Sequence, residues 1–316
     1  MPKKIKKLGV VMDEITSINI SKDSTFAMLL EAQNRNIEIF YMLLDDLSII
    51  NGEAIAMTRT ISINENNDEW WNFESENRIP LSNLDAILMR KDPPFDMEYI
   101  YATYILSLAE TKGTKIINKP QSLRNMNEKA YISWFPQCAP PTIVTRSIKD
   151  IRTFLNEHHK IVVKPLDGMG GKSIFVVDEK DNNANVIFET ITDSEAKYAM
   201  IQSYIPDIKK GDKRILIIDG KPFPYSLARI PPPDDNRGNL VAGAIGKGQK
   251  LSSRDLWICE EIGSTLKENG VIFAGIDVIG DYLTEVNVTS PTGIRELDKI
   301  YESNIAALLL DAIEEN

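Results

Sequence analysis

The segment 274–296, A-G-I-D-V-I-G-D-Y-L-T-E-V-N-V-T-S-P-T-G-I-R-E, constrains the fold of this chain more than any other stretch. Its β-branched residues flank a turn at 280–281 of sequence Gly-Asp, which predicts the two strands of a hairpin. Glu285 and Asn287 lie two residues apart on the second strand, so their side chains leave the same face of the sheet. A strict two-residue loop would aim Asp277 at the opposite face. A bulge or a three-residue loop brings Asp277 opposite Glu285, and this is the register that we predict.

Two carboxylates and an amide on one patch are the oxygen donors that suit Mg2+, which typically takes one or two carboxylates, waters and phosphate oxygens. A hairpin with a solvated acidic face explains these three residues equally well. The remainder of the chain decides between the two interpretations.

Composition excludes several classes of function. A formal net charge of -10 over 316 residues argues against a nucleic-acid binder or an anionic-membrane binder, because both need a basic face. No apolar segment reaches the length of a membrane span or of a signal-peptide core. Cys138 and Cys259 are isolated, as is usual in a reducing cytosol, so we expect a cytoplasmic protein. His158 and His159 are the only histidines, which argues against triad and zinc chemistry.

The first part of the chain alternates between strand and helix patterns. Strands are predicted at 7–12, 37–43, 84–90 and 115–118, with helices from about Asp23 and from Asp96 to about Lys112. This β-α-β start favours a parallel sheet with ligands at the carboxyl ends of its strands, where Arg90 lies. An Asn51-Gly52 pair predicts a hairpin, and the polar segment 64–77 is interpreted as a surface excursion.

A second module follows a predicted helix from Pro120 through Trp134, because composition changes near 136–141. Its predicted elements are strands at 142–145, 160–165, 174–178 and 197–205, a helix at 148–158, a hairpin turning at 219–220 and a helix at 252–269. The segment 231–248 shows neither helix nor strand periodicity. It is rich in Pro, Gly and Asn, which is typical of a lid or a disordered loop.

The loop L-D-G-M-G-G-K-S ends like a Walker motif but is not one. Leu166 stands where that motif needs glycine, and a β-branched run follows where it needs a helix. A glycine-rich turn between two strands can fold over a triphosphate and donate its bare N-H groups to phosphate oxygens. An ordinary wide turn remains the alternative. Lys213, Arg214 and Arg229 lie in or beside the next hairpin, where cations could balance phosphates.

Several motifs together resemble the prokaryotic glutathione synthetases of the ATP-grasp superfamily. The lysine-glycine loop V-K-P-L-D-G-M-G-G and the acidic hairpin are typical of the superfamily, while R-K-D-P-P-F-D and N-V-T-S-P-T-G-I-R-E are typical of this family. The resemblance extends over nearly the whole chain through S-I-N-I-S-K-D-S-T-F, Y-A-T-Y-I-L, N-K-P-Q-S-L-R, G-D-K-R, L-A-R-I-P and R-G-N-L.

This resemblance implies an α/β fold with an N-terminal Rossmann-like parallel-sheet domain at 1–124 and a two-lobed α+β ATP-grasp domain at 125–316. The lid lobe would span about 142–205 and the catalytic lobe about 206–316. The implied reaction joins glycine to the cysteinyl carboxylate of γ-glutamylcysteine through an acyl phosphate made from ATP. Such chemistry depends on positioning and charge neutralisation, so cations and a metal matter more than a side-chain nucleophile.

The family motifs also imply roles for individual residues. The ATP-binding residues would be Lys129, Lys164, Gly168, Gly170, Gly171, Gln202, Ser203, Tyr204, Ile205 and Asp212. The ligands of Mg2+ or Mn2+ would be Asp277, Glu285 and Asn287. The catalytic cations would be Arg229, Arg214 and Arg237, and the peptide-substrate residues would be Asn19, Arg90, Ser290, Thr292 and Gly293. Family likeness further suggests a homotetramer or homodimer.

One departure lies in the expected lid, where the family reads A-G-G-R-G and this chain reads A-G-A-I-G at 242–246. Ala244 restricts the backbone and Ile245 removes a cation, which affects lid closure rather than the phosphate and metal positions. Two alternatives stay open: another ATP-grasp carboxylate-amine ligase, and a protein that binds the nucleotide without turnover.

Overall fold

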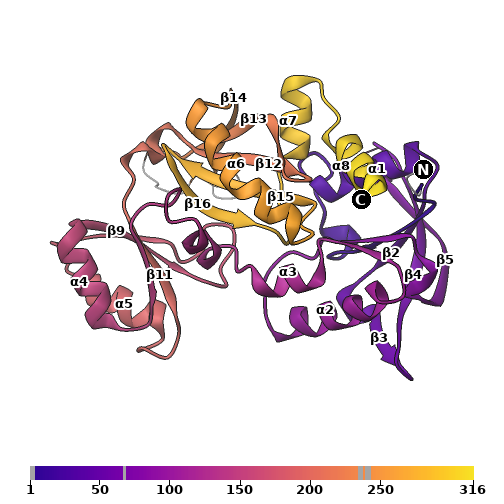
Figure 1. The fold of residues 1–316 in the computed structure, drawn as a ribbon, viewed down its shortest axis with the longest axis horizontal. Helices are drawn as coiled ribbons and strands as arrows, with labels where there is room; N and C mark the ends of the chain where they lie inside the picture. The colour runs from indigo at the N-terminus through magenta and orange to yellow at the C-terminus, as the bar shows by residue number, and fades with distance from the viewer. Residues whose placement is uncertain (1–3, 67–68, 234–237, 239–242) are drawn as a thin grey trace.

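The computed structural model describes residues 4–66, 69–233, 238 and 243–316, and it contains three sheets (Figure 1). The N-terminal domain and the C-terminal elements lie side by side, while a small lobe of two helices on a sheet projects from the other end of the molecule. This arrangement is the expected α/β architecture of a parallel-sheet domain followed by two α+β lobes.

The N-terminal sheet is built on four parallel strands in the order β2-β1-β6-β7. Its strands are β1 (Lys7–Val11), β2 (Glu38–Met42), β3 (Leu47–Ile50), β4 (Glu53–Ile63), β5 (Trp71–Pro80), β6 (Ala86–Met89) and β7 (Lys115–Ile117). Helices α1 (Ser24–Asn34) and α2 (Met97–Glu110) begin where predicted, because Asp23 and Asp96 cap them by accepting from Phe26 N and Tyr99 N.

Two predictions in this region are wrong. The surface excursion expected at 64–77 is largely strand β5, which pairs antiparallel with β4. Its outer face is polar, but Trp71 and Phe73 pack against each other, with ring centroids 4.7 Å apart. The single helix expected from Pro120 to Trp134 is instead α3 (Pro120–Asn125) and a 3-10 turn, η4 (Ala130–Trp134). The side chain of Asn127 accepts from the backbone N-H groups of Lys129 and Ala130, which favours a break over a continuous helix.

The small lobe is an antiparallel sheet in the order β10-β9-β11-β8 with two helices packed on it. Its elements are β8 (Thr142–Thr145), α4 (Ile148–His158), β9 (Lys160–Pro165), β10 (Phe175–Asp178), α5 (Ala184–Thr192) and β11 (Ala199–Ser203). Helix α5 is not predicted from the sequence. A hydrophobic cluster that includes Ile151, Ile161 and Phe188 lies entirely within this lobe.

The large lobe is a second antiparallel sheet in the order β14-β13-β12-β15-β16. Its elements are β12 (Asp212–Ile218), β13 (Lys221–Ile230), β14 (Ile245–Lys250), α6 (Ser253–Glu268), β15 (Phe273–Ile279), β16 (Tyr282–Asn287), α7 (Ile294–Tyr301) and α8 (Ile305–Glu315). The expected lid is partly wrong, because its last residues from Ile245 pair with β13 as a strand. Residues 234–237 and 239–242 of that segment lie outside the described part.

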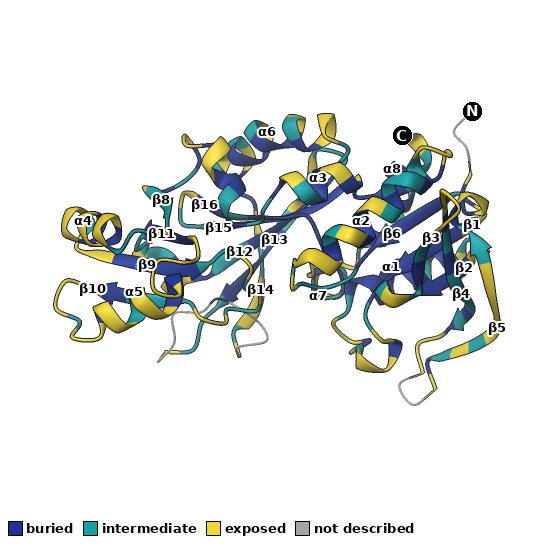
Figure 2. Cartoon of the chain, turned by 90° about the horizontal axis from the view of Figure 1, so that it is seen from below, coloured by how far each residue is buried: buried dark blue, intermediate teal, exposed yellow. Residues whose placement is uncertain are grey.

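The cores of the N-terminal domain and the large lobe are continuous. The C-terminal helix α8 returns to pack against α1, and its Leu309 and Leu310 are fully buried in a cluster that also holds Phe26 and Leu29. Figure 2 shows this inner layer as buried strands and helix faces, with exposed positions on the outward sides of the helices. The small lobe does not contribute to this cluster.

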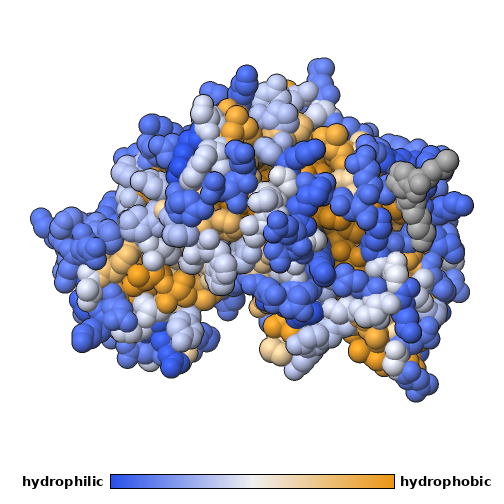
Figure 3. Space-filling model, in the orientation of Figure 1, coloured by the Kyte–Doolittle hydropathy of each residue, from blue (hydrophilic) through white to orange (hydrophobic). Residues whose placement is uncertain are grey.

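The face shown in Figure 3 is mainly hydrophilic and is hollowed at its lower margin between the small lobe and the N-terminal domain. Among the described residues, none of the helices is both long enough and apolar enough to span a membrane.

Candidate active site

A solvent-open cavity of about 1070 Å³ is lined by the small lobe and the large lobe. Strands β9, β10 and β11 supply one wall, and β12, β13, β15 and β16 supply the other. The cavity brings together every ATP and metal candidate named from the sequence, and also two of the arginines: Lys129, Lys164, Gly168, Gly170, Gly171, Gln202, Ser203, Tyr204, Ile205, Asp212, Arg214, Arg229, Asp277, Glu285 and Asn287. Arg237 lies outside the described residues.

The acidic hairpin has the predicted register. Asp277 pairs with Glu285 and Gly275 pairs with Asn287, because a bulge interrupts the ladder after Asp277. The bulged residue is Thr284, whose hydroxyl donates to the carbonyl of Asp277 at 3.1 Å. The extra residue therefore turns both carboxylates into the cavity.

Asp277 is the electrostatic centre of the site. Arg214 holds it with two bonds, Nε to Oδ1 at 2.5 Å and Nη2 to Oδ2 at 3.0 Å, and Arg229 Nη2 lies 3.0 Å from Oδ2. All three side chains are buried. Burial alone would raise the pKa of Asp277, but the two guanidinium groups outweigh it and hold that pKa below its ordinary value. Asp277 is thus ionised and balances two buried cations.

Asp212 lies on the other side of Arg229, whose Nη2 donates to its Oδ2 at 2.7 Å. Burial, together with the negative charges of Asp277 and Glu285, raises the pKa of Asp212 to about 7, although Arg229 acts in the opposite direction. Its second oxygen, Oδ1, is buried and has no hydrogen-bond partner among the residues that the structure describes. A buried acceptor in this state is suited to a donor or cation supplied by a ligand.

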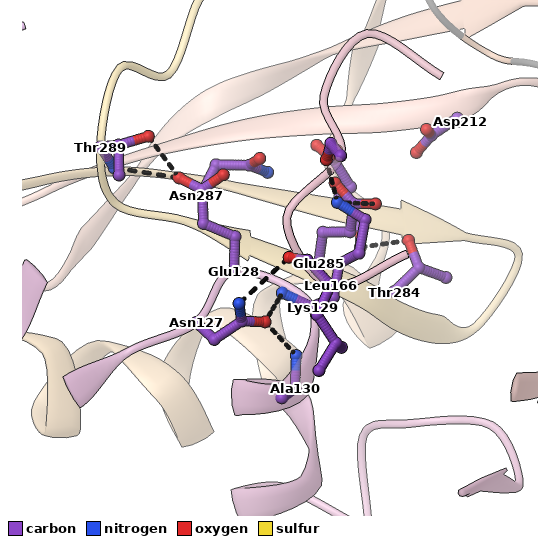
Figure 4. Close-up of polar contacts among 12 residues, drawn as sticks. Asn127, Glu128, Lys129, Ala130, Leu166, Asp212, Thr284, Glu285, Asn287 and Thr289 are labelled. Carbon is purple, nitrogen blue, oxygen red and sulfur yellow. Dashed lines mark hydrogen bonds and ion pairs between the residues drawn. The ribbon is translucent and has the colours of Figure 1, made fainter. Parts of the chain in front are cut away.

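Two buried lysines face these carboxylates. Lys129 donates from Nζ to the carbonyl of Gly168 at 2.5 Å and lies 3.9 Å from Glu285 Oε1 (Figure 4). Lys164 lies on β9 within the same cavity, and burial lowers its pKa. Two lysines beside a glycine loop with positive φ at Gly170 and Gly171 form a suitable binding site for a polyphosphate.

The chemistry of the donor set also fits a hard divalent cation. Asn287 donates from Nδ2 to the carbonyl of Gly275 at 3.0 Å, which leaves its Oδ1 available beside the carboxylates of Asp277 and Glu285. In the described part of the chain, no group of three or more His, Cys, Asp or Glu side chains is arranged to hold a metal. A cation here therefore needs oxygens from a bound ligand, as in metal-nucleotide sites.

Several cavity residues are not predicted from the sequence. The additional lining residues are Glu128, Val162, Met169, Lys172, Ile174, Val176, Ile208, Gly238, Ile279 and Thr284. Strand alternation could have found part of this set, because Val162 lies two residues before Lys164 and Ile174 lies two before Val176, each pair on one face. The position of Glu128 depends on tertiary contacts that carry no local signal.

The peptide-substrate candidates form a separate group that borders Arg214. Arg90 is buried and donates to the carbonyl of Pro291 at 3.0 Å, while Arg214 donates to the carbonyl of Thr292 at 3.3 Å. The loop that carries Ser290, Thr292 and Gly293 thus lies between these two arginines. Asn19 lies in the turn before α1, where its side-chain oxygen accepts from the backbone N-H and hydroxyl of Ser21.

Comparisons with known proteins agree with this geometry. The family model described as "Prokaryotic glutathione synthetase, ATP-grasp domain" matches residues 128–302, and that described as "Prokaryotic glutathione synthetase, N-terminal domain" matches 7–124. The glutathione synthetases of Vibrio parahaemolyticus and of Escherichia coli strain K12 are each 56% identical over 308 residues, and each alignment covers 98% of both chains. That of Vibrio vulnificus strain YJ016 is 58% identical over 98% of this chain and 97% of its own.

Solved structures show the same fold at low identity. D-cycloserine synthetase DcsG superposes with a TM-score of 0.69 at 15% identity, covering 98% of this chain and 99% of its own. Macrocyclase MdnC, bound with precursor peptide MdnA from Microcystis aeruginosa MRC, gives a TM-score of 0.62 at 14% identity over 98% of this chain and 100% of its own. Three sheets, a glycine loop between two strands and an acidic hairpin across the cavity define an ATP-grasp ligase. Given the family matches and the full-length identity, the chain belongs to the prokaryotic glutathione synthetase family.

Proposed function

We propose that this enzyme joins glycine to γ-glutamylcysteine with ATP, giving glutathione, ADP and phosphate. The main support for this proposal is that two buried lysines and a glycine loop face an acidic hairpin across one cavity. Phosphoryl transfer needs this combination, because negative charge must be gathered and neutralised around the transferred group. The full-length identity to glutathione synthetases of several bacteria supports the choice of substrates.

The proposed nucleotide site follows from the charges. Lys129 and Lys164 bind phosphate oxygens, and the glycine loop donates N-H groups from Gly168, Gly170 and Gly171. The strand end at 202–205 lines the base pocket, where Gln202, Ser203, Tyr204 and Ile205 lie in the same wall of the cavity as the apolar side chains of β9 and β10. Asp212 accepts from the ribose, which would satisfy its unpartnered Oδ1.

The proposed chemical centre lies between the hairpin and the arginines. Asp277, Glu285 and Asn287 would hold Mg2+ or Mn2+ together with phosphate oxygens, and a metal bound there would supply charge neutralisation at the transferred phosphoryl group. Arg229 stabilises the oxyanion that develops when glycine attacks. Arg214, and Arg237 beyond the described part, serve the phosphate or the substrate carboxylates.

The peptide substrate is placed at the border of the N-terminal domain. Arg90, Asn19, Ser290, Thr292 and Gly293 surround it, next to Arg214. We place the domain boundary between residues 124 and 125 and take the catalytic lobe from about residue 206. A cytoplasmic homotetramer or homodimer is the proposed form of the enzyme.

The decisive experiment measures ADP release from Mg-ATP with γ-glutamylcysteine, with and without glycine, and detects the tripeptide by mass spectrometry. We expect ADP and glutathione to appear together only with both substrates. Turnover with D-alanine pairs or with a protein glutamate instead would indicate a different carboxylate-amine ligase. Thermal stabilisation by ATP without ADP from any pair would indicate a binding protein.

A further inference from the structure

Glu128 lies where the main cavity meets a second, smaller cavity of about 330 Å³. One carboxylate oxygen, Oε1, accepts from the backbone N-H groups of Val288 and Thr289, both at 3.0 Å, and from the Thr289 hydroxyl at 2.7 Å (Figure 4). The backbone carbonyl of Glu128 accepts from Val286 N at 2.8 Å. Glu128 thus makes hydrogen bonds both to the end of strand β16 and to the first two residues beyond it.

These bonds matter because β16 is the outer strand of its sheet. Val288 and Thr289 are buried, and their N-H groups follow the end of the strand, so Glu128 supplies the acceptor that a neighbouring strand would supply elsewhere. Hydrogen bonds to a charged acceptor are stronger than neutral ones, and a buried N-H without an acceptor is strongly unfavourable. The path of the chain beyond Asn287 therefore depends on Glu128.

The segment 288–293, whose first residues bind Glu128, is the loop that lies between Arg90 and Arg214. Its next contacts are Arg90 to the carbonyl of Pro291 and Arg214 to the carbonyl of Thr292, followed by Ile294 N donating to Ser24 Oγ at 3.2 Å. The smaller cavity is lined by Thr289 on one side and by Pro93 and Phe95 of the N-terminal domain on another. Glu128 therefore holds the end of this segment that lies beside the main cavity.

We infer that Glu128 is a positioning residue for the peptide substrate: it fixes the 288–293 segment relative to the phosphate-binding Lys129 next to it. This inference rests on the function proposed above. Glu128 acts through the segment, so its loss affects the KM of the dipeptide more than the affinity for ATP.

The test compares Glu128→Ala with Glu128→Gln in the full-length enzyme. The amide oxygen of glutamine can still accept from Val288 and Thr289, whereas alanine leaves both N-H groups without an acceptor. We expect Glu128→Ala to raise the KM for γ-glutamylcysteine by roughly tenfold or more, with the ATP dissociation constant changed by less than about twofold. Glu128→Gln should restore most of the lost affinity. Glu268→Ala, at an exposed glutamate on α6, is the matched control and should behave as wild type.

Two other outcomes overturn the inference. Equal losses in dipeptide KM and ATP affinity would mean that Glu128 supports the whole cavity, and an unchanged dipeptide KM would mean that the segment is held without it. If Glu128→Ala does not fold, Thr289→Val is the second test, because it removes the bond from the Thr289 hydroxyl to Glu128 Oε1. This variant should raise the KM for γ-glutamylcysteine by a smaller but measurable factor. If the wild-type enzyme does not make the tripeptide, the proposed function is wrong. If the wild type makes it but the variants do not change the dipeptide KM as expected, only the inference about Glu128 is wrong.

Discussion

Asp277 neutralises two buried guanidinium groups at once, so its removal affects more than metal binding. Replacement by alanine leaves Arg214 buried without its carboxylate and leaves Arg229 with Asp212 alone. Breaking a buried ion pair in this way typically destabilises a protein by about 3–5 kcal/mol. Glu285 is less buried and lies 3.9 Å from Lys129, so its replacement leaves no such pair of charges.

We therefore expect Glu285→Gln to abolish Mg-ATP turnover with a melting temperature close to wild type, and Asp277→Ala to lose both turnover and stability. Thermal melting and ADP release on the same samples check this. Full activity in either variant would contradict the metal assignment, and equal melting temperatures would contradict the electrostatic role of Asp277.

Asp212 gives the stability of the protein a specific dependence on pH. Its pKa in the folded state is about 7, above the value of 3.8 for an ordinary aspartate, so between these two pH values the folded state holds a proton that the unfolded state has released. Its contribution to the free energy of unfolding is fully present below about pH 4 and is lost as the pH rises through 7.

Urea unfolding at pH 5 and pH 8 should show that wild type loses about 2 kcal/mol more than Asp212→Asn over this interval. The asparagine variant is the reference because it cannot titrate but keeps a similar shape. Parallel pH profiles of the two proteins would show that Asp212 does not carry the raised pKa.

The glycine loop between β9 and β10 is the element whose backbone conformation matters most for the nucleotide. Gly170 has φ +66°, and no atom lies within 4 Å of the place that an alanine Cβ would take, so an alanine there meets backbone strain of about 1–2 kcal/mol rather than a clash. Gly52, in the hairpin between β3 and β4, has φ +79° and the same open surroundings. The two positions differ mainly in their distance from the cavity.

We expect Gly170→Ala to weaken ATP binding by roughly tenfold, because one to two kcal/mol of strain at the loop opposes the bound conformation. Gly52→Ala should leave ATP binding unchanged and is the matched control. Isothermal titration with a non-hydrolysable ATP analogue measures both. Identical affinities for the two variants would show that the loop does not fold over the phosphates.

Elements with strong local signals are the ones that the sequence predicts correctly. The two strands β15 and β16 follow from their β-branched residues around a Gly-Asp turn, but their register required the choice of a bulge over a strict two-residue loop. Helices α1, α4 and α6 follow from apolar spacing with a capping residue at each start. Local sequence signals do not predict strand β5, because its residues are mostly exposed and polar, a composition that is typical of a loop. The break at 126–129 combines local bonds, from the N-H groups of Lys129 and Ala130 to the Asn127 side chain, with a distant one from that side chain to the carbonyl of Leu166. The position of Glu128 depends on Val288 and Thr289, which are far along the chain.

At the scale of the whole molecule, the buried clusters predict two cooperative regions rather than three, although Met200 of β11 packs in a cluster shared with the N-terminal domain and the large lobe. Leu310 on α8 is fully buried in a cluster shared by the N-terminal domain and the large lobe, whereas Phe188 lies in the separate core of the small lobe. Sequence patterns identify the modules, but the return of the C-terminal helix onto α1 is a tertiary contact with no local signal.

Native-state hydrogen exchange should separate the two regions. Leu310→Ala, expected to cost about 2–5 kcal/mol, should reduce protection in β1 and β12 together and leave β9 and β11 unchanged. Phe188→Ala should do the reverse. A uniform loss of protection across all three sheets in both variants would show that the molecule unfolds as one unit.

The backbone bonds along β16 also determine where the small lobe can hinge. Leu283 N donates to the carbonyl of Cys138 and Val286 N to that of Glu128, which fixes residues 128–138 to the large lobe. A rotation of the small lobe relative to the large lobe would therefore bend the chain after Cys138 and in the 204–211 link to β12, and it would leave Asn127 and Lys129 with the large lobe. The bonds from Asn127 to Leu166 and from Lys129 to Gly168 cross that boundary, so such a rotation would have to break them. A ligand phosphate that binds the Lys129 ammonium would replace one of these two bonds.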